Sequence, residues 1–305
     1  MCLDEEVLDK YLKAGEIVHK TLEKAIDAVK PGLKIEALCD NLEAYIVSQG
    51  ARPAFPVNVS INEVAAHYTS PIGDPSRIPE NGLVKIDVGA HVDGYIVDAA
   101  VTVPLTSKYQ LFVDASMAAL RDIATRLKPG VNLGRLGGVI ERAIRSYGLS
   151  PVRNLTGHLI SRYRLHAGKS VPNVSTITLS KTLPGEIYAI EPFATDGRGF
   201  VIEDLNSYIY RLKTVKRVKE TSLRRLLKVI KNRFDRLPFA ERWLKNYMSV
   251  TSLRENMRKM LSLKIIQEYP VLVEQSGGYV SQMEDTFVVT RRGAFPLART
   301  LSIIK

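Results

Sequence analysis

Residues 83–103 read LVKIDVGAHVDGYIVDAAVTV, two apolar runs on either side of a polar sequence. Leu83–Gly89 and Tyr95–Val103 are rich in β-branched and apolar residues, which predicts two strands. The intervening His91-Val92-Asp93-Gly94 is typical of a hairpin turn. The stretch therefore predicts an antiparallel pair of strands.

The same hairpin carries two acidic side chains in apolar surroundings. If the turn is centred between Val92 and Asp93, Asp87 lies directly opposite Asp98. Both then point to one side of the sheet because strand side chains alternate, with Cβ atoms roughly 5 Å apart. Like charges so placed repel each other, so a shared proton or bound cations must offset the repulsion.

Helical patterns occur twice along the chain. Apolar spacing predicts one helix pair with stops at Pro31-Gly32 and Gly50, and a second pair with stops at Pro129-Gly130 and Gly148. The second set of stops follows the first by 98 residues, which suggests a duplicated unit. Helices set beside antiparallel strands indicate an α+β fold.

Positive charge is concentrated in one segment. The chain has a net charge of +11, yet residues 211–264 contain 17 Lys or Arg and 4 Asp or Glu, a net of +13. We expect a basic helical insertion at 206–268 within a discontinuous domain formed by 1–205 and 269–305. Its apolar stripes predict three helices, at Ser222–Phe234, Pro238–Tyr247 and Thr251–Leu263.

Length and composition limit the class of protein. The 305 residues suffice for one large domain with an insertion, and 45% apolar with 25% charged residues is typical of globular proteins. No apolar run is long enough to span a bilayer, and the acidic start is not a signal peptide. Cys2 and Cys39 indicate inert thiols rather than disulfides or metal ligands. We therefore expect a cytoplasmic protein without a membrane segment; as a separate expectation, we take it to be a monomer.

Three further polar residues occur in apolar settings. His158 lies in a turn-like stretch, Glu191 follows the predicted strand Glu186–Glu191, and Glu284 lies inside the predicted strand Tyr279–Thr290. Each alone has a structural explanation, a solvated strand face or a hydrogen-bonded core histidine. Together with Asp87 and Asp98 they form a set of hard oxygen ligands with one nitrogen, which suits two divalent ions such as Mn, Fe, Co or Zn.

A series of separated motifs resembles the methionine aminopeptidases, in order and spacing along nearly the whole chain. The motifs are Ala65-Ala66-His67-Tyr68, Lys85-Ile86-Asp87-Val88-Gly89 with Asp98-Ala99, Gly157-His158, His166-Ala167-Gly168-Lys169, Ala189-Ile190-Glu191-Pro192-Phe193 and Gln282-Met283-Glu284. The insertion between Glu191 and Glu284 resembles that of the type 2 branch. The lack of an N-terminal extension resembles the archaeal form.

The resemblance implies a pseudo-twofold pita-bread fold, consistent with the repeat, and a role for each ligand. Asp87 would bind one metal ion, Asp98 and Glu284 would bridge both, and His158 and Glu191 would complete the second site. The ions would lie roughly 3.5–4 Å apart. The implied reaction is removal of the N-terminal methionine from nascent polypeptides, favouring a small second residue.

The resemblance also assigns residues to the substrate. Glu191 would shuttle a proton from a metal-activated water, and His67 and His166 would position the scissile peptide and stabilise its oxyanion. Plausible walls of an apolar methionine pocket are Phe55, Tyr68, Leu165, Phe193 and Tyr279. His19, on a helix, and His91, at the turn, are expected to be structural.

One position departs from the family, which commonly has His where this chain has Asp285. On a strand Asp285 points away from the face of Glu284, so we expect no direct metal contact. The basic insertion resembles a winged-helix-like module, which predicts contact with ribosomal RNA. The alternatives are a non-enzymatic RNA- or ribosome-binding protein of this fold and an Xaa-Pro peptidase, as in prolidases.

Overall fold

A computed structural model describes residues 3–304, so Cys2 lies outside the described residues. The helices are α1 (Glu5–Ala28), α2 (Ile35–Ser48), α3 (Gln110–Arg126), α4 (Leu133–Arg145), α5 (Thr221–Phe234) and α6 (Val250–Ser262), with 3-10 turns η1 (Ser107–Tyr109), η2 (Glu241–Leu244) and η3 (Thr300–Ser302). The strands are β1 (Arg52–Pro53), β2 (Asn58–Ile61), β3 (Val64–Ala66), β4 (Leu83–Val92), β5 (Tyr95–Pro104), β6 (Ser150–Pro151), β7 (Thr156–Ile160), β8 (Ser170–Pro172), β9 (Ile187–Ile190), β10 (Phe193–Thr195), β11 (Val201–Leu212), β12 (Phe239–Ala240), β13 (Ile266–Glu274), β14 (Val280–Gln282), β15 (Asp285–Val289) and β16 (Ala294–Pro296). Among these residues, no helix combines the length and apolar character needed to cross a membrane.

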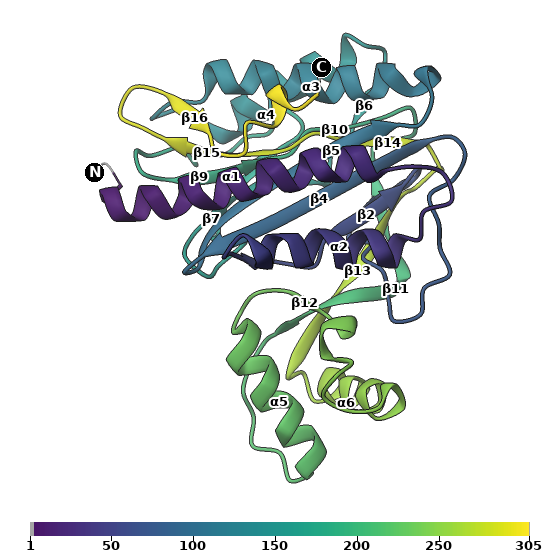
Figure 1. Cartoon of the computed structure of the whole chain (residues 1–305). Helices are drawn as coiled ribbons and strands as arrows, with labels where there is room; N and C mark the ends of the chain where they lie inside the picture. Colours follow the sequence, from purple (N-terminus) through teal and green to yellow (C-terminus); the bar gives the residue numbers. More distant parts are fainter. Residues whose placement is uncertain (1–2, 305) are drawn as a thin grey trace.

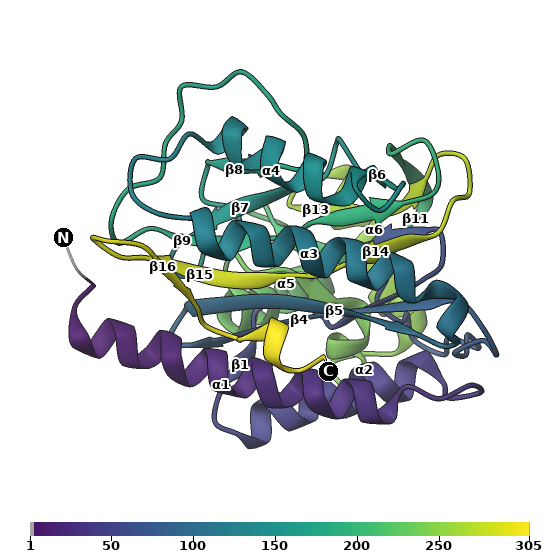
Figure 2. The same cartoon turned by 90° about the horizontal axis from the view of Figure 1, so that it is seen from above.

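The two helix pairs are structurally equivalent, which confirms the predicted duplication. After α1, the N–H of Gly32 donates to the carbonyl of Ile78 at 2.8 Å; after α3, that of Gly130 donates to Thr182, also at 2.8 Å. Both glycines have a φ of +82°, a conformation that side chains with a Cβ rarely adopt. The pairs α1–α2 and α3–α4 lie on opposite sides of the strands (Figures 1 and 2), which gives the expected pseudo-twofold α+β architecture.

The hairpin forms with a register different from the predicted one. Its two-residue turn is Asp93-Gly94, with φ angles of 51° and 87°, and Val92 pairs with Tyr95. Both turn residues take positive φ because that geometry matches the twist of the strands. Asp98 therefore pairs with Gly89, and Asp87 pairs with Ala100, so the expected direct opposition of the two carboxylates is wrong. Because the pairing is shifted by two residues from the predicted register, the side chains of Asp87 and Asp98 still lie on the same face of the sheet.

Two other local predictions also needed correction. His158 lies within strand β7, paired with β8 and β9, rather than in a turn. Glu284 is not inside a continuous strand: it lies in the break between β14 and β15, where it exchanges backbone hydrogen bonds with Ala100 of β5. The break lets β14 pair with β10 while β15 pairs with β9, so the chain crosses between two sheets at Glu284.

The insertion forms a lobe with an apolar core of its own, visible below the strands in Figure 1. The predicted outer helices are α5 and α6. The predicted middle helix is instead strand β12 followed by the 3-10 turn η2. The reason is local pairing, because Phe239 and Ala240 bond to Tyr210 and Ile209 of β11, which holds this backbone extended.

A buried ion pair joins the lobe to the rest of the protein. The Arg242 guanidinium of η2 donates to both carboxylate oxygens of Glu43 on α2 and to Thr69. Glu43 also accepts from Trp243 Nε1 at 2.6 Å and from the backbone N–H of Val57 at 2.9 Å. The pair is well satisfied and fixes where the lobe sits.

Candidate metal centre

The ligand candidates converge from distant parts of the sequence on one cavity of about 80 Å³. Strands β4 and β5 supply Asp87 and Asp98, β7 supplies His158, and Glu191 follows β9. Glu284, at the break after β14, completes the five. His67, His166, Phe55 and Leu165 also line the cavity.

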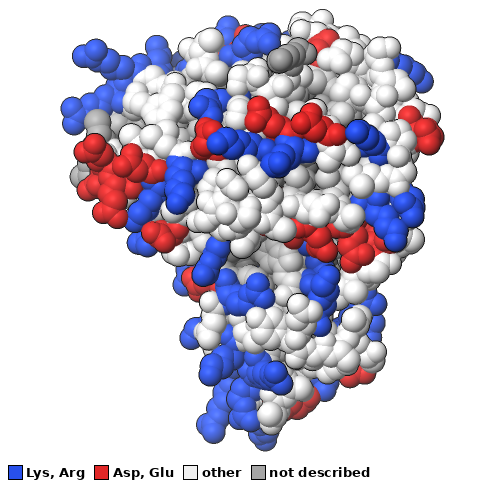
Figure 3. All heavy atoms as spheres, viewed as in Figure 1, with Lys and Arg blue, Asp and Glu red and all other residues white. Residues whose placement is uncertain are grey.

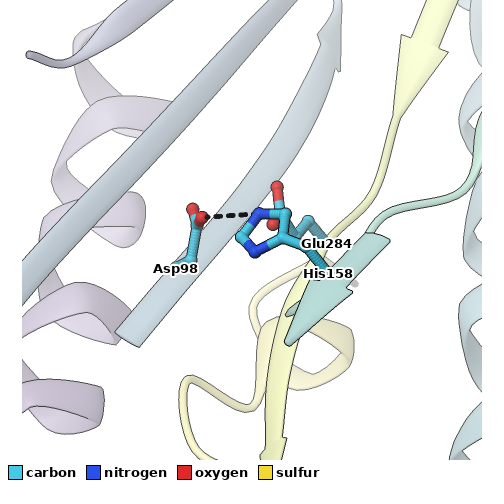
Figure 4. Close-up of side chains that lie close together, drawn as sticks. All are labelled: Asp98, His158 and Glu284. Atoms are coloured by element: carbon cyan, nitrogen blue, oxygen red, sulfur yellow. Dashed lines mark ion pairs between the residues drawn. The ribbon is translucent and has the colours of Figure 1, made fainter. Parts of the chain in front are cut away.

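The chemical groups face one another at ligand spacing (Figure 4). Ligand atoms of Asp98, His158 and Glu284 all lie within 4.8 Å of one another. Nε2 of His158 lies 3.6 Å from Oδ2 of Asp98 and 3.7 Å from Oε1 of Glu191. These separations exceed hydrogen-bond length, so a shared cation rather than direct contact would satisfy the atoms.

The electrostatics of the cavity favour a cation. Burial raises the pKa of Asp87 to about 7. Burial, followed by repulsion from neighbouring carboxylates, raises the pKa values of Asp98, Glu191 and Glu284 well above their usual range. In the described chain no Lys or Arg lines the cavity to offset these charges. Burial also lowers the pKa of His158, which keeps its imidazole neutral, as metal binding requires.

Unsatisfied atoms give an independent sign that a group belongs here. Oδ1 of Asp87 and Oδ1 of Asp98 are buried without a hydrogen-bond partner. Buried polar atoms are rarely left so, because the loss of hydration is costly. Carboxylate oxygens together with one imidazole nitrogen are a donor set that fits divalent ions. The residues present therefore fit a divalent metal.

Neighbouring residues hold the candidate ligands in place, and none of them was assigned a role from the sequence. Gln282 Nε2 donates to Glu284 Oε2 at 2.9 Å, and Thr286 Oγ1 contacts both backbone groups of Asp98. Asn58, paired with Asp87 across β2 and β4, also lines the cavity. The sequence signal that could have indicated Asn58 is that it is a polar residue within an apolar run.

Asp285 points away from the cavity, as the strand geometry predicted. Its carboxylate accepts from the backbone N–H groups of Ala298 at 3.0 Å and Thr300 at 2.7 Å. Burial raises its pKa to about 6. Asp285 therefore anchors the C-terminal segment and does not line the cavity.

His67 and His166 line both the cavity and an adjoining hollow of about 330 Å³, which Phe193 also lines. Nδ1 of His67 lies 3.0 Å from the carbonyl oxygen of Pro270, and its backbone has a φ of 66°. The His166 ring lies 4.3 Å from that of His158. Both histidines thus lie where the cavity and the adjoining hollow meet.

Only some of the residues predicted as walls of the methionine pocket line the cavity. Phe55 and Leu165 line the cavity, together with three residues the sequence did not suggest, Ile209, Pro238 and Tyr269. The structure places Tyr279 elsewhere: its ring packs on that of Tyr109, with centroids 5.0 Å apart, and it lines neither hollow. Tyr68 directs its hydroxyl to Asp74 and Ser76 instead. Nδ1 of His19 lies 2.7 Å from the carbonyl oxygen of Ala298, and Nδ1 of His91 accepts from the N–H of Gly94 at 3.1 Å.

Comparisons with known proteins give a consistent result. The model of metallopeptidase family M24 matches residues 9–291. Methionine aminopeptidases of Methanothermobacter thermautotrophicus and Saccharolobus solfataricus are 43% and 44% identical, each over 94% of this chain and 97% and 96% of their own.

Solved structures share the fold at lower identity. A thermophilic Arx1 superposes with a TM-score of 0.86 at 17% identity, covering 100% of this chain and 95% of its own. The methionine aminopeptidase of Thermotoga maritima gives 0.71 at 21%, covering 98% of both chains. The prolidase of Pyrococcus furiosus gives 0.62 at 18%, covering 98% of this chain and 65% of its own. At these identities the likeness shows the architecture alone.

Proposed function

The chain belongs to metallopeptidase family M24, among the methionine aminopeptidases, and we propose that it releases methionine from nascent polypeptides in the cytoplasm. The supporting observation is the convergence of four carboxylates and one imidazole on one buried cavity. A preference for a small second residue goes with this assignment.

Use of a divalent metal follows from the family and the donor set. We propose two ions, of Co, Mn, Fe or Zn, held by Asp87, Asp98, His158, Glu191 and Glu284. Asp98 and Glu284 would contribute ligands to both ions. Asp87 would complete the site of one ion, and His158 with Glu191 would complete the site of the other. When bound, such ions polarise a peptide carbonyl and lower the pKa of bound water.

Residues of the chain supply the proton handling and positioning. Glu191 lines both the metal-facing cavity and the outer hollow, so its carboxylate can take a proton on one side and deliver it to the leaving amine on the other. Burial lowers the pKa of His67, which keeps its imidazole neutral. The carbonyl oxygen of Pro270 takes the single N–H of a neutral His67, so its Nε2 would accept a hydrogen bond from the substrate. His166 would then donate to the scissile carbonyl.

The methionine side chain would occupy the apolar end of the cavity. Phe55, Leu165 and Tyr269 would provide its walls, together with Pro238 of residues 206–268, which lines the same cavity. Phe193 lines the outer hollow, where the rest of the substrate would lie. A hydrophobic wall discriminates by only about 1–3 kcal/mol per methylene, so the small second residue would be selected by crowding.

A peptide comparison separates this function from its rivals. We expect release of methionine from Met-Ala-Ser and no cleavage of Xaa-Pro peptides, whereas a prolidase-like enzyme gives the reverse. Asp98→Ala should abolish turnover while circular dichroism stays unchanged. Normal turnover by that variant, or preference for Xaa-Pro, overturns the assignment.

We also propose that residues 206–268 form a distinct basic unit that contacts ribosomal RNA. The support is the concentration of positive charge in this segment, a net of +13 over residues 211–264. RNA affinity should fall steeply as salt rises, because phosphate contacts release counterions. Absence of salt-dependent RNA binding overturns this proposal and leaves the peptidase assignment untouched.

A further inference from the structure

A second hollow, of about 640 Å³, lies where the lobe meets the loop after β7. We call it the basic hollow. It is lined by Tyr163, Arg164, Arg211, Leu212, Lys213, Thr214, Val215, Lys231, Asp235 and Arg236. The lining carries five cations and a single carboxylate. Lys and Arg side chains also predominate on the visible face of the lobe in Figure 3.

The cations of the basic hollow lack counterions. Within residues 3–304, none of the five lies within 4.0 Å of a carboxylate, whereas Arg242, Lys245, Arg254 and Lys259 of the same lobe are paired. Nε of Arg211 is buried and has no hydrogen-bond acceptor. Like charges gathered without partners repel each other, and an anion would relieve that repulsion.

The backbone around the basic hollow is held in place. The N–H of Tyr163 donates to Gly94 at 2.8 Å. On the opposite wall, the N–H groups of Lys213 and Thr214 both donate to the carbonyl of Ile265, at 2.8 and 3.1 Å. The hollow therefore exists before any ligand arrives, which lowers the entropic cost of binding.

We propose that the basic hollow binds the phosphate groups of a nucleotide, either free or within an RNA strand. Several phosphate oxygens can accept hydrogen bonds from Lys and Arg at once, and phosphate is a strong partner for guanidinium groups. This site narrows the proposed RNA contact of residues 206–268 to one hollow and rests on that proposal for a strand as the ligand, but it does not depend on the peptidase reaction.

Two lining arginines connect with the metal-facing cavity. Nε of Arg164 donates to the carbonyl of His166 at 3.1 Å. Arg211 shares a face of β11 with Ile209, a cavity wall two residues away. Substituting either arginine would disturb the peptidase, so the test uses Lys213 and Arg236, which touch only the basic hollow.

The experiment measures binding of a fluorescent RNA strand of about 12 nucleotides to the full, metal-loaded chain at low salt. The double variant Lys213→Gln with Arg236→Gln is compared with Arg224→Gln with Arg225→Gln. The control removes the same charge from exposed positions of α5 outside the hollow. We expect at least about tenfold weaker binding in the first variant and less than about threefold in the control. Both variants should release methionine normally.

Competition by AMP distinguishes the two sources of phosphate. Displacement of RNA by AMP supports a site that accepts a free nucleotide, whereas failure of AMP with retained RNA binding supports a strand as the ligand. Equal weakening in both double variants means diffuse attraction over the lobe and overturns the proposal. If neither the RNA strand nor AMP binds the chain, the proposal is overturned as well.

Discussion

Oδ2 of Asp98 and Nε2 of His158 face each other at 3.6 Å across the cavity, although 60 positions separate them in the chain. Nε2 of His158 also lies 3.7 Å from Oε1 of Glu191, and Glu284 presents a further ligand atom within 4.8 Å of both. A metal-free cavity keeps these carboxylates buried without a counterion.

Adding Co²⁺ or Mn²⁺ to the metal-free chain should therefore raise its melting temperature by several degrees. An ion at 100 times its Kd stabilises by about 2.7 kcal/mol, and each kcal/mol shifts Tm by about 2–4 °C for domains of 150–250 residues. Scanning fluorimetry measures the shift. Asp98→Asn should lose most of it, and an equal shift in that variant contradicts the ligand assignment.

The pair formed by Arg242 and Glu43 should contribute strongly to stability. Arg242→Met leaves the Glu43 carboxylate buried without its cation, which costs about 3–5 kcal/mol. The matched control is Arg254→Met, whose arginine pairs with Glu241 but is 44% exposed. We expect a loss below about 1 kcal/mol there. Urea unfolding of both variants checks the contrast, and equal losses would contradict it.

Gly89→Ala should damage the methionine pocket without removing a ligand. A Cβ at Gly89 would meet Cε1 of Phe55 at 2.1 Å, so the ring must move. We expect kcat/KM for Met-Ala-Ser to fall at least about tenfold while metal content stays normal. Adding Phe55→Leu should restore part of the activity. Gly293→Ala is the control, because nothing lies within 4 Å of its added Cβ. Unchanged kinetics in Gly89→Ala would count against Phe55 as a wall.

Cys39 should make stability depend on pH in the alkaline range. Burial raises the pKa of its thiol from 9.0 to about 11. The folded state then keeps a proton that the unfolded state loses, so stability present below about pH 9 declines as pH rises towards 11. The decline is at most about 1.4 kcal/mol per pH unit. The check is to measure the unfolding free energy of the wild type and of Cys39→Ala at about pH 8 and pH 10.5. The difference, wild type minus variant, should be smaller at the higher pH. A constant difference would contradict it.

The sequence predicted much of the fold because its local signals are strong. Pro31-Gly32 and Pro129-Gly130 end helices by backbone restriction alone, so their duplication was readable. The hairpin shows the limit, since the positive φ angles of Asp93 and Gly94 place the turn one residue later than expected. The prediction that Asp87 and Asp98 share a face still holds, because strand side chains alternate with a period of two residues.

Features that depend on tertiary pairing could not be predicted. The break at Glu284 arises because β14 and β15 pair with different strands, and β12 replaces a helix because it pairs with β11. Pocket walls were hardest to predict, since aromatic residues in cores are common. Tyr279 carried no signal that separated it from Tyr269, which does line the cavity.

The ligand roles and the number of ions can be tested together by metal analysis and peptide kinetics on the same samples. We expect two ions per chain, and methionine release from Met-Ala-Ser that rises in proportion as metal is restored. The Asp98→Ala variant should lose both the bound metal and the activity. Full activity in protein shown to be free of metal, or an Asp98→Ala variant that keeps both its ions and its activity, would contradict the account.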